Sequence, residues 1–296
     1  MEIGFDRLAA RARRSLPSPV AAARVRRHLR QNDEPLIGEL VHHVPMVDPA
    51  ISPRSARLPV WLAFAVAMAG AAAMLASGLG SRFGLFDYGF AFALLRAAGW
   101  IGAAGAVLCL AALPLARRLG ERRALAALLI GVVAGAASFG VSWSMQRAAS
   151  GAPPLHDIST DTTDPPQFVA LAALRRASRN SAAYPGPAAA EAQRKAYPDI
   201  LPLAVGAHPA AAYQRCLEAA RALGWQIALA DPKAMRIEAT DTTRFFGLKN
   251  DIVIRVTSLG AASRVDIRSA SRVGRGDLGA NARRIRAFYR EMARKG

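Results

Sequence analysis

Residues 60–80 read VWLAFAVAMAGAAAMLASGLG and contain no charged side chain. A helix of this length rises about 30 Å, which is the thickness of the hydrocarbon core of a bilayer. A buried helix of a soluble protein can imitate one such run, but two more follow, at about 92–115 and 124–145. The charge within them, Arg96, lies near the start of the second run, where its long side chain can reach the interface. We therefore predict three transmembrane helices.

The arginines that flank these runs predict the orientation. The link between the second and third runs carries four arginines between positions 117 and 123, whereas the link between the first and second carries Arg82 and Asp87. The first 59 residues hold ten arginines. Because positive residues in short flanks stay in the cytoplasm, we expect a cytoplasmic N-terminus and a C-terminal domain outside. The expected location is the inner (plasma) membrane of a bacterium, with the C-terminal domain in the periplasm.

The first 57 residues form a basic arm on the expected cytoplasmic side. Its arginines come in two bursts, at 11–14 and 24–30. The arm either lies on anionic lipid as an amphipathic segment, or lacks fixed structure and only enforces the orientation. Met46 is an alternative start, so translation of residues 1–45 stays open.

Small residues within the predicted spans indicate close packing. Gly131 and Gly135 form a GxxxG pair, a spacing that lets helices approach closely, either within the chain or in a dimer. Cys109 lies in the second apolar run and Cys216 in the distal domain. We therefore expect two separate, packed thiols and no disulfide between them.

The charge balance narrows the partners. Lysine and arginine number 39 against 21 acidic residues, which gives a formal net charge of +18. Such a charge suits anionic partners. The partners expected are the lipid bilayer and, beyond it, an anionic lipid, an envelope polymer or another membrane protein. A nucleic acid is not expected, because the basic arm lacks interleaved aromatic residues.

The distal segment, 148–296, has the pattern of an α+β domain. Residues 209–223 place apolar side chains at helical spacing, and 278–294 do so again after the capping residue Asp277. Another helix is expected to begin after Asp164. Four short segments alternate apolar and polar residues with period two, as strands do, at about 225–230, 235–240, 252–257 and 264–268. The short links favour a four-stranded antiparallel sheet with helices on one face and the other face open, attached to the all-α transmembrane bundle of three helices.

Three stretches of this domain carry a family resemblance: HDISTDTTDPPQF (156–168), RIEATDTTRFFGLKNDIVIRV (236–256) and SRVDIRSASRVGRGDLGANARRIRAF (263–288). They resemble a widespread bacterial membrane family with relatives in plastids, the domain of unknown function 1499. The likeness runs from about residue 56 to 290 and includes GSRFGLFDYG at 80–89. Where the family usually has a serine before Asp-Leu-Gly, this chain has Gly276. The resemblance implies an architecture and supplies no reaction.

The alternation of the strands predicts a basic surface on the open sheet face. Glu238, Asp251 and Asp266 would share this face, so the arginines either recognise a phosphate or carboxylate or form cross-strand ion pairs. Residues Gly274–Gly279 match GxGxxG and contain a further arginine, Arg275. A dinucleotide site would need a strand that returns to the sheet after this motif, and no such strand follows. We therefore expect a tight turn before a helix. The candidate anion ligands are Arg236, Arg244, Arg255, Arg264, Arg268, Arg272 and Arg275.

A cluster of acidic residues with one histidine offers a second site. Oxygen-rich segments can hold a metal ion, and histidine beside aspartate can do acid–base work. The same residue types also make local turns and caps, and the spacing matches no EF-hand loop. The candidate metal ligands are His156, Asp157, Asp161 and Asp164.

These features favour a non-enzymatic envelope protein. Its membrane bundle would present a small periplasmic module that binds an anionic envelope component or a partner protein. No cofactor is expected. The alternative is a metal-assisted envelope enzyme centred on His156, and a third possibility is a structural assembly factor. The sequence assigns neither a ligand, a physiological role nor an oligomeric state.

Overall fold

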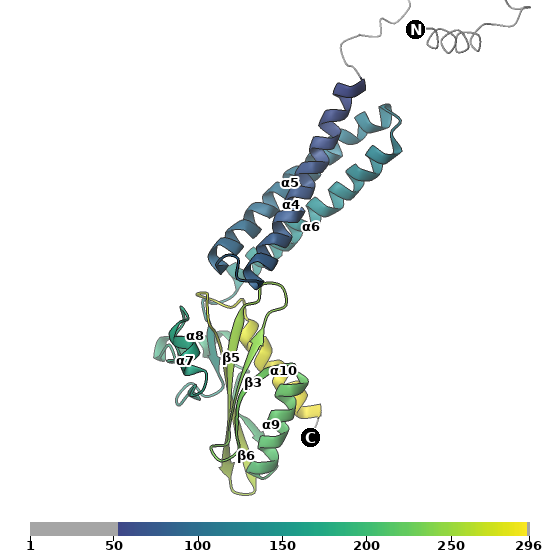
Figure 1. The fold of residues 1–296 in the computed structure, drawn as a ribbon. Coiled ribbons are helices and arrows are strands. Elements are labelled where there is room, and N and C mark those ends of the chain that lie inside the picture. The colour runs from purple at the N-terminus through teal and green to yellow at the C-terminus, as the bar shows by residue number, and fades with distance from the viewer. Residues whose placement is uncertain (1–52, 295–296) are drawn as a thin grey trace, which may run out of the picture. The chain divides into compact units, whose positions relative to one another are not determined.

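A computed structural model describes residues 53–294 (Figure 1). Residues 1–52 of the predicted basic arm lie outside the described residues. Three helices in the described part of the chain are long and apolar enough to cross a membrane, as predicted. Each extends beyond its predicted apolar run, and Asp87 caps the second by accepting the backbone N–H groups of residues 89 and 90. The helices are α4 (Pro53–Arg82), α5 (Tyr88–Arg118) and α6 (Arg122–Gly151).

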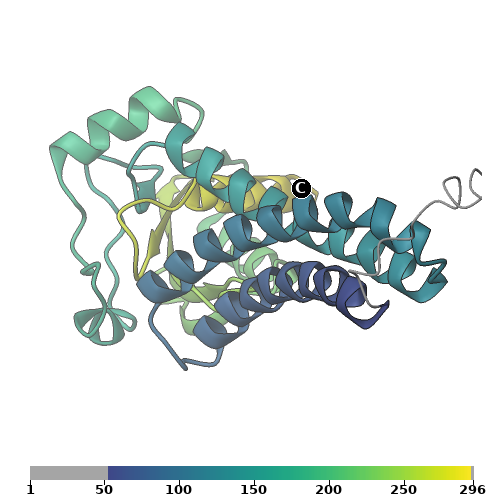
Figure 2. The same ribbon diagram turned by 90° about the horizontal axis from the view of Figure 1, so that it is seen from above.

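Small residues let these helices pack closely, side by side (Figure 2). A Cβ atom added to Gly135 of α6 would lie 2.4 Å from the carbonyl oxygen of Gly102 in α5. A Cβ atom on Gly131 would lie 2.7 Å from the sulfur of Cys109. The GxxxG pair therefore serves packing within the chain. Larger apolar side chains such as Val107 and Val133 point outward, at 64% and 70% exposure, as lipid-facing residues do.

The distal domain is built on an antiparallel sheet, as predicted, but within the described residues the sheet has six strands and not four. Its path is β1-β6-β5-β4-β3, and β2 also pairs with β6. The two strands that the sequence did not predict, β1 and β2, each have three residues and pair with successive stretches of β6. The strands are β1 (Asp157–Ser159), β2 (Leu203–Val205), β3 (Gln226–Asp231), β4 (Arg236–Thr242), β5 (Lys249–Leu259) and β6 (Ala262–Ser271).

One face of the sheet carries the main core. Helices α9 (Pro209–Ala222) and α10 (Ala280–Arg294) pack on this face, where Ile237, Ile254 and Ile267 form one buried row across the three central strands. The predicted helices at 209–223 and 278–294 are thus present. The Asp277 carboxylate accepts the backbone N–H groups of residues 279 and 281, which is the capping role expected of it.

The opposite face, called the outer face here, is covered, and the prediction of an open face was wrong. Figure 1 shows α7 (Ala172–Arg176) and α8 (Pro187–Ala196) on the other side of the sheet from α9 and α10. Residues 161–182, the covering segment, bring Phe168 and Leu171 onto Val253 and Ala270 of the sheet. The helix expected directly after Asp164 is only the five-residue α7, because the N–H groups of residues 169 and 171 donate to Glu238 of the sheet.

Candidate functional site

Five of the seven candidate arginines share the outer face, as the alternation predicted: Arg236, Arg255, Arg264, Arg268 and Arg272. The register places Arg236 opposite Arg255, and Arg255 opposite Asp266. The other two candidates, Arg244 and Arg275, are exposed in loops beyond the ends of the strands.

Arg268 lies at the centre of the outer face and is fully buried. Its Nη2 atom lies 2.7 Å from Oδ2 of Asp157, with side chains 0% and 1% exposed. The rings of Phe168 and Tyr184 lie 4.9 and 5.4 Å from its guanidinium carbon. It also donates to the backbone carbonyl of residue 182, at 2.9 Å. Arg268 therefore binds the covering segment, and no surface anion can reach it.

At the rim of this face, Arg255 and Arg264 share three carboxylates. The Arg264 Nη2 atom lies 2.6 Å from Oδ2 of Asp161, and its Nε atom 3.1 Å from Oδ2 of Asp266. The Arg255 Nη1 atom lies 2.8 Å from Oδ2 of Asp164. Burial alone would raise the pKa of Asp161, but two backbone N–H donors and the two guanidinium groups bring this pKa below its usual value. The carboxylates predicted to hold a metal thus neutralise the arginines predicted to hold an anion.

The structure does not bring the four candidate metal ligands together around one point. Asp157 is bound to Arg268, whereas Asp161 and Asp164 face Arg255. The segment at His156 is fixed through its backbone carbonyl, which accepts the N–H of residue 271 at 2.8 Å. Among residues 53–294, no group of three or more His, Cys, Asp or Glu side chains is placed to hold a metal ion. The geometry gives the metal-assisted enzyme no support.

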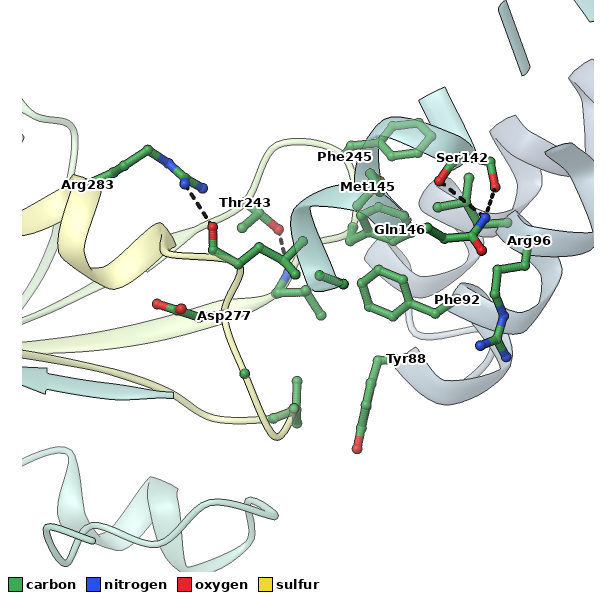
Figure 3. Close-up of a pocket in the computed structure, with 18 residues that line it drawn as sticks. Tyr88, Phe92, Arg96, Ser142, Met145, Gln146, Thr243, Phe245, Asp277 and Arg283 are labelled. Carbon is green, nitrogen blue, oxygen red and sulfur yellow. Dashed lines mark hydrogen bonds between the residues drawn. The ribbon is translucent and has the colours of Figure 1, made fainter. Parts of the chain in front are cut away.

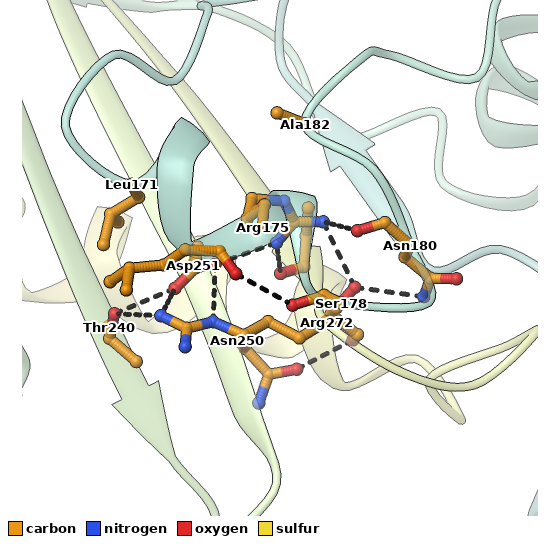
Figure 4. Close-up of polar contacts among 12 residues, drawn as sticks. Leu171, Arg175, Ser178, Asn180, Ala182, Thr240, Asn250, Asp251 and Arg272 are labelled. Atoms are coloured by element: carbon orange, nitrogen blue, oxygen red, sulfur yellow. Dashed lines mark hydrogen bonds and ion pairs between the residues drawn. The ribbon is translucent and has the colours of Figure 1, made fainter.

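A second buried ion cluster was not predicted from the sequence (Figure 4). The Arg175 Nη1 atom lies 2.9 Å from Oδ2 of Asp251, and both side chains are 0% exposed. Arg272 binds the same carboxylate through Nη2 at 2.8 Å. Burial lowers the pKa of Arg175, although Asp251 opposes the shift. Two guanidinium groups therefore share one negative charge, so the cluster carries an excess of positive charge.

The loop between β4 and β5, residues 243–248, fastens the domain to the membrane helices. The Ser81 hydroxyl donates to the carbonyl of Phe246 at 3.0 Å, and Arg82 Nη1 donates to the carbonyl of Arg244 at 2.5 Å. The ring of Phe246 stacks on that of Phe92 in α5, with centroids 4.9 Å apart. The stretch TRFFGL, part of the family resemblance, thus holds the domain against α4 and α5.

A cavity of about 590 Å³ lies beside this loop, and we call it the junction cavity (Figure 3). Helices α5 and α6 line one side, and the 243–248 loop and residues 273–278 line the other. Its walls are mainly apolar, with Phe92, Met145 and Phe245 among them. Two basic side chains, Arg96 and Arg283, lie at its edge on the span side and the domain side, respectively. Asp277 also lines the domain side, so the lining carries one positive charge in excess, which suits a molecule with an apolar body and a negative charge.

Residues 157–292 match the family model described as Protein of unknown function (DUF1499). This segment is a DUF1499 domain. The match confirms the resemblance over these residues, and the spans precede it. No curated protein matches the chain.

The DUF1499 domain contributes only one side of the junction cavity, because residues 88–149 of the lining precede the family match. The GxGxxG turn belongs to this side: Gly274, Gly276 and Leu278 line the cavity, and the turn connects β6 to α10. Sequence reasoning missed the cavity. A signal was present in the aromatic residues of GSRFGLFDYG and TRFFGL, but nothing in the sequence pattern shows that these two stretches meet.

Proposed function

We propose that the chain is an inner-membrane protein whose DUF1499 domain lies in the periplasm and that it binds an amphiphilic envelope component in the junction cavity, without catalysis. The observation that carries this proposal is the cavity itself, which is apolar and lined jointly by membrane helices and the domain. Of the partners expected from the sequence, these walls favour a lipid over a polar polymer, because polar chains gain little from apolar walls.

The position of the cavity along the helices supports access from lipid. Each long helix has 30 or 31 residues and so measures about 45 Å, enough for the hydrocarbon core and the headgroup regions. The cavity begins at Tyr88, the first residue of α5, and extends to Arg96, about 12 Å further along the helix axis. In a bilayer this depth covers the headgroup region and the start of the acyl chains.

The chemistry at the same level fits a lipid with a polar end. Arg96 is exposed, and among the described residues no carboxylate pairs with it. Phe83 and Leu85, in the link between α4 and α5, are 70% and 76% exposed, as side chains that reach the membrane interface are. An acyl chain would bury the apolar walls, and its charged end would point toward the domain side of the cavity, where Arg283 lies.

A cavity-filling variant tests the proposal. Ala149 lines the cavity at the end of α6, whereas its neighbour Ala148 does not, and both are exposed. In the full chain purified from membranes, wild type and Ala148→Trp should retain co-purified lipid, and Ala149→Trp should lose most of it, as measured by native mass spectrometry. Equal lipid retention by the two tryptophan variants would contradict a ligand in this cavity.

A further inference from the structure

A second hollow, of about 340 Å³, adjoins the junction cavity. We call it the headgroup hollow. The two spaces share four lining residues, Tyr88, Phe246, Leu248 and Val273, so they lie on either side of one wall. They differ in chemistry: the junction cavity is mainly apolar, whereas charged side chains surround the headgroup hollow.

The charges around the headgroup hollow are mainly positive. Three basic side chains, Arg179, Lys249 and Arg272, line it with one acidic residue, Asp87. The Asp87 carboxylate is already occupied, because its Oδ1 atom accepts the N–H groups of residues 89 and 90, at 2.6 and 3.1 Å, at the start of α5. Within the lining, Asp87 thus supplies one negative charge, partly offset by the helix N-terminus, against three positive charges.

Arg272 connects the headgroup hollow to the buried ion cluster of the domain (Figure 4). Its Nε and Nη2 atoms bind Asp251, which Arg175 also binds from the interior. Arg175 is fully buried, and its other donors bind backbone carbonyls such as that of residue 270, at 3.0 Å. The Nη1 group of Arg272 makes no hydrogen bond with any residue from 53 to 294. The Asp251 carboxylate thus pairs with two guanidinium groups, and one of them, that of Arg272, borders the headgroup hollow.

Arg179 and Lys249 approach from two other segments. The guanidinium group of Arg179 donates to the hydroxyl of Tyr88 at 3.1 Å and lies over its ring, 5.0 Å from the centroid. Tyr88 belongs to the shared wall, so this arginine lies where the two spaces meet. Lys249 lies beside Arg272, whose N–H donates to its carbonyl at 3.1 Å. Cations from three segments therefore converge next to an apolar cavity.

We propose that the headgroup hollow binds the phosphate of an anionic phospholipid whose acyl chain occupies the junction cavity, an inference that rests on the proposed function. Guanidinium and ammonium groups are the usual protein ligands of phosphate, and charge-assisted hydrogen bonds are the strong ones. A zwitterionic headgroup would place its own cation against Arg179 and Lys249. The hollow should therefore select lipids of net negative charge.

The test compares headgroups on the full chain. The protein is placed in bilayer discs of equal parts phosphatidylglycerol and phosphatidylcholine, then extracted, and the retained lipids are identified by native mass spectrometry. Wild type should retain phosphatidylglycerol about tenfold over phosphatidylcholine. The double variant Arg179→Gln/Lys249→Gln should lose this preference and keep the total amount of bound lipid. Arg176→Gln removes an exposed charge outside the hollow and should keep the preference.

The outcomes separate the two proposals. Equal retention of both lipids by wild type, or an unchanged preference in the double variant, would overturn the headgroup assignment and leave the cavity proposal standing. No retention of either lipid would overturn both. Binding of inorganic phosphate by the lipid-free chain, lost in the double variant, together with equal retention of the two lipids by wild type, would assign the hollow to a soluble anion and overturn the lipid assignment. Arg272 is left unchanged throughout, because its bond to Asp251 is part of the fold.

Discussion

Asp157 and Arg268 form a buried pair between β1 and β6, and Arg268 also donates to the carbonyls of residues 166 and 182 in the covering segment. Asp157→Asn would leave an unpaired guanidinium in the interior, and breaking a buried pair in this way costs about 3–5 kcal/mol. Cys216 reports the effect, because burial raises its thiol pKa to about 12 and unfolding exposes it to a maleimide. In the full chain carrying Cys109→Ala, the variant should label Cys216 about 100-fold faster or more, if opening is at equilibrium.

The matched control is Asp199→Asn, which breaks the pair with Arg286 at the surface. These side chains are 52% and 36% exposed, and such pairs contribute less than about 1 kcal/mol. The control should therefore change the labelling of Cys216 by no more than about fivefold. Equal acceleration by the two variants would show that the pair of Asp157 with Arg268 stabilises the fold no more than the surface pair does.

Asp161 gives the domain a defined response to acid. Its pKa in the folded protein is below the usual value of about 3.9, so its ionised form stabilises the fold above that value. This contribution is lost as the pH falls through the lower folded pKa. The free energy of unfolding, measured by urea titration from pH 6 down to pH 2.5, should decrease, with a shallower slope for Asp161→Asn. An identical slope would mean that the contacts of Asp161 with Arg255 and Arg264 do not contribute to the free energy of unfolding.

The residues of the outer face were predictable, but their partners were not. Strand alternation identifies Arg255, Arg264 and Arg268 as neighbours, because the side-chain period of a strand is two. Their carboxylate partners include Asp157 and Asp161, which lie 94 or more positions away along the chain. No local pattern encodes such a pairing, so a buried ion network had the same sequence signature as an exposed binding face.

At the scale of single elements, the packing of α6 against α5 depends on glycines at the positions where a side chain would collide with the neighbouring helix. Gly135→Ala would bring a methyl group to 2.4 Å from a carbonyl oxygen of α5, whereas Gly140 has no atom within 4 Å of an added Cβ. Overpacking of this kind costs about 1–3 kcal/mol. The melting temperature of the detergent-solubilised chain, followed by circular dichroism, should fall in Gly135→Ala and stay unchanged or rise in Gly140→Ala. A stable Gly135→Ala variant would contradict the tight contact between α5 and α6.

The elements found from the sequence are those with enough residues to show a period. Strands β3 to β6 and helices α9 and α10 each span six or more residues and were predicted, although β5 and β6 extend two or three residues beyond their predicted ends on each side. Strands β1 and β2 have three residues each, and α7 has five, too few for alternation or helical spacing to appear. The covering segment contains no strand and one short helix, α7, and only tertiary contacts define its place on the sheet.

For the whole molecule, the contacts at the two ends of the bundle show that the three long helices alternate in direction. The Arg57 Nε atom lies 2.6 Å from Oε1 of Glu121, so the start of α4 meets the turn between α5 and α6. At the other end, Ser81 and Arg82 of α4 bind the 243–248 loop of the domain. A bundle that crosses a bilayer would thus place the DUF1499 domain on the opposite side from the arginine-rich turn at 117–123.

The arginine-rich turn should therefore decide on which side of the membrane the domain lies. Alkaline phosphatase, which folds only outside the cytoplasm, should be active when fused after Gly296, because four arginines at 117–123 oppose transfer of their turn across the membrane. Replacing these four arginines by glutamine should lower phosphatase activity per fusion protein, whereas replacing Arg82 alone should not, since a charge in the outer link works against the expected orientation. A fusion that is inactive as phosphatase, while a fluorescent protein at the same position is bright, would place the domain in the cytoplasm. The junction cavity would then open toward the inner leaflet, and its ligand would have to come from the lipids of that side.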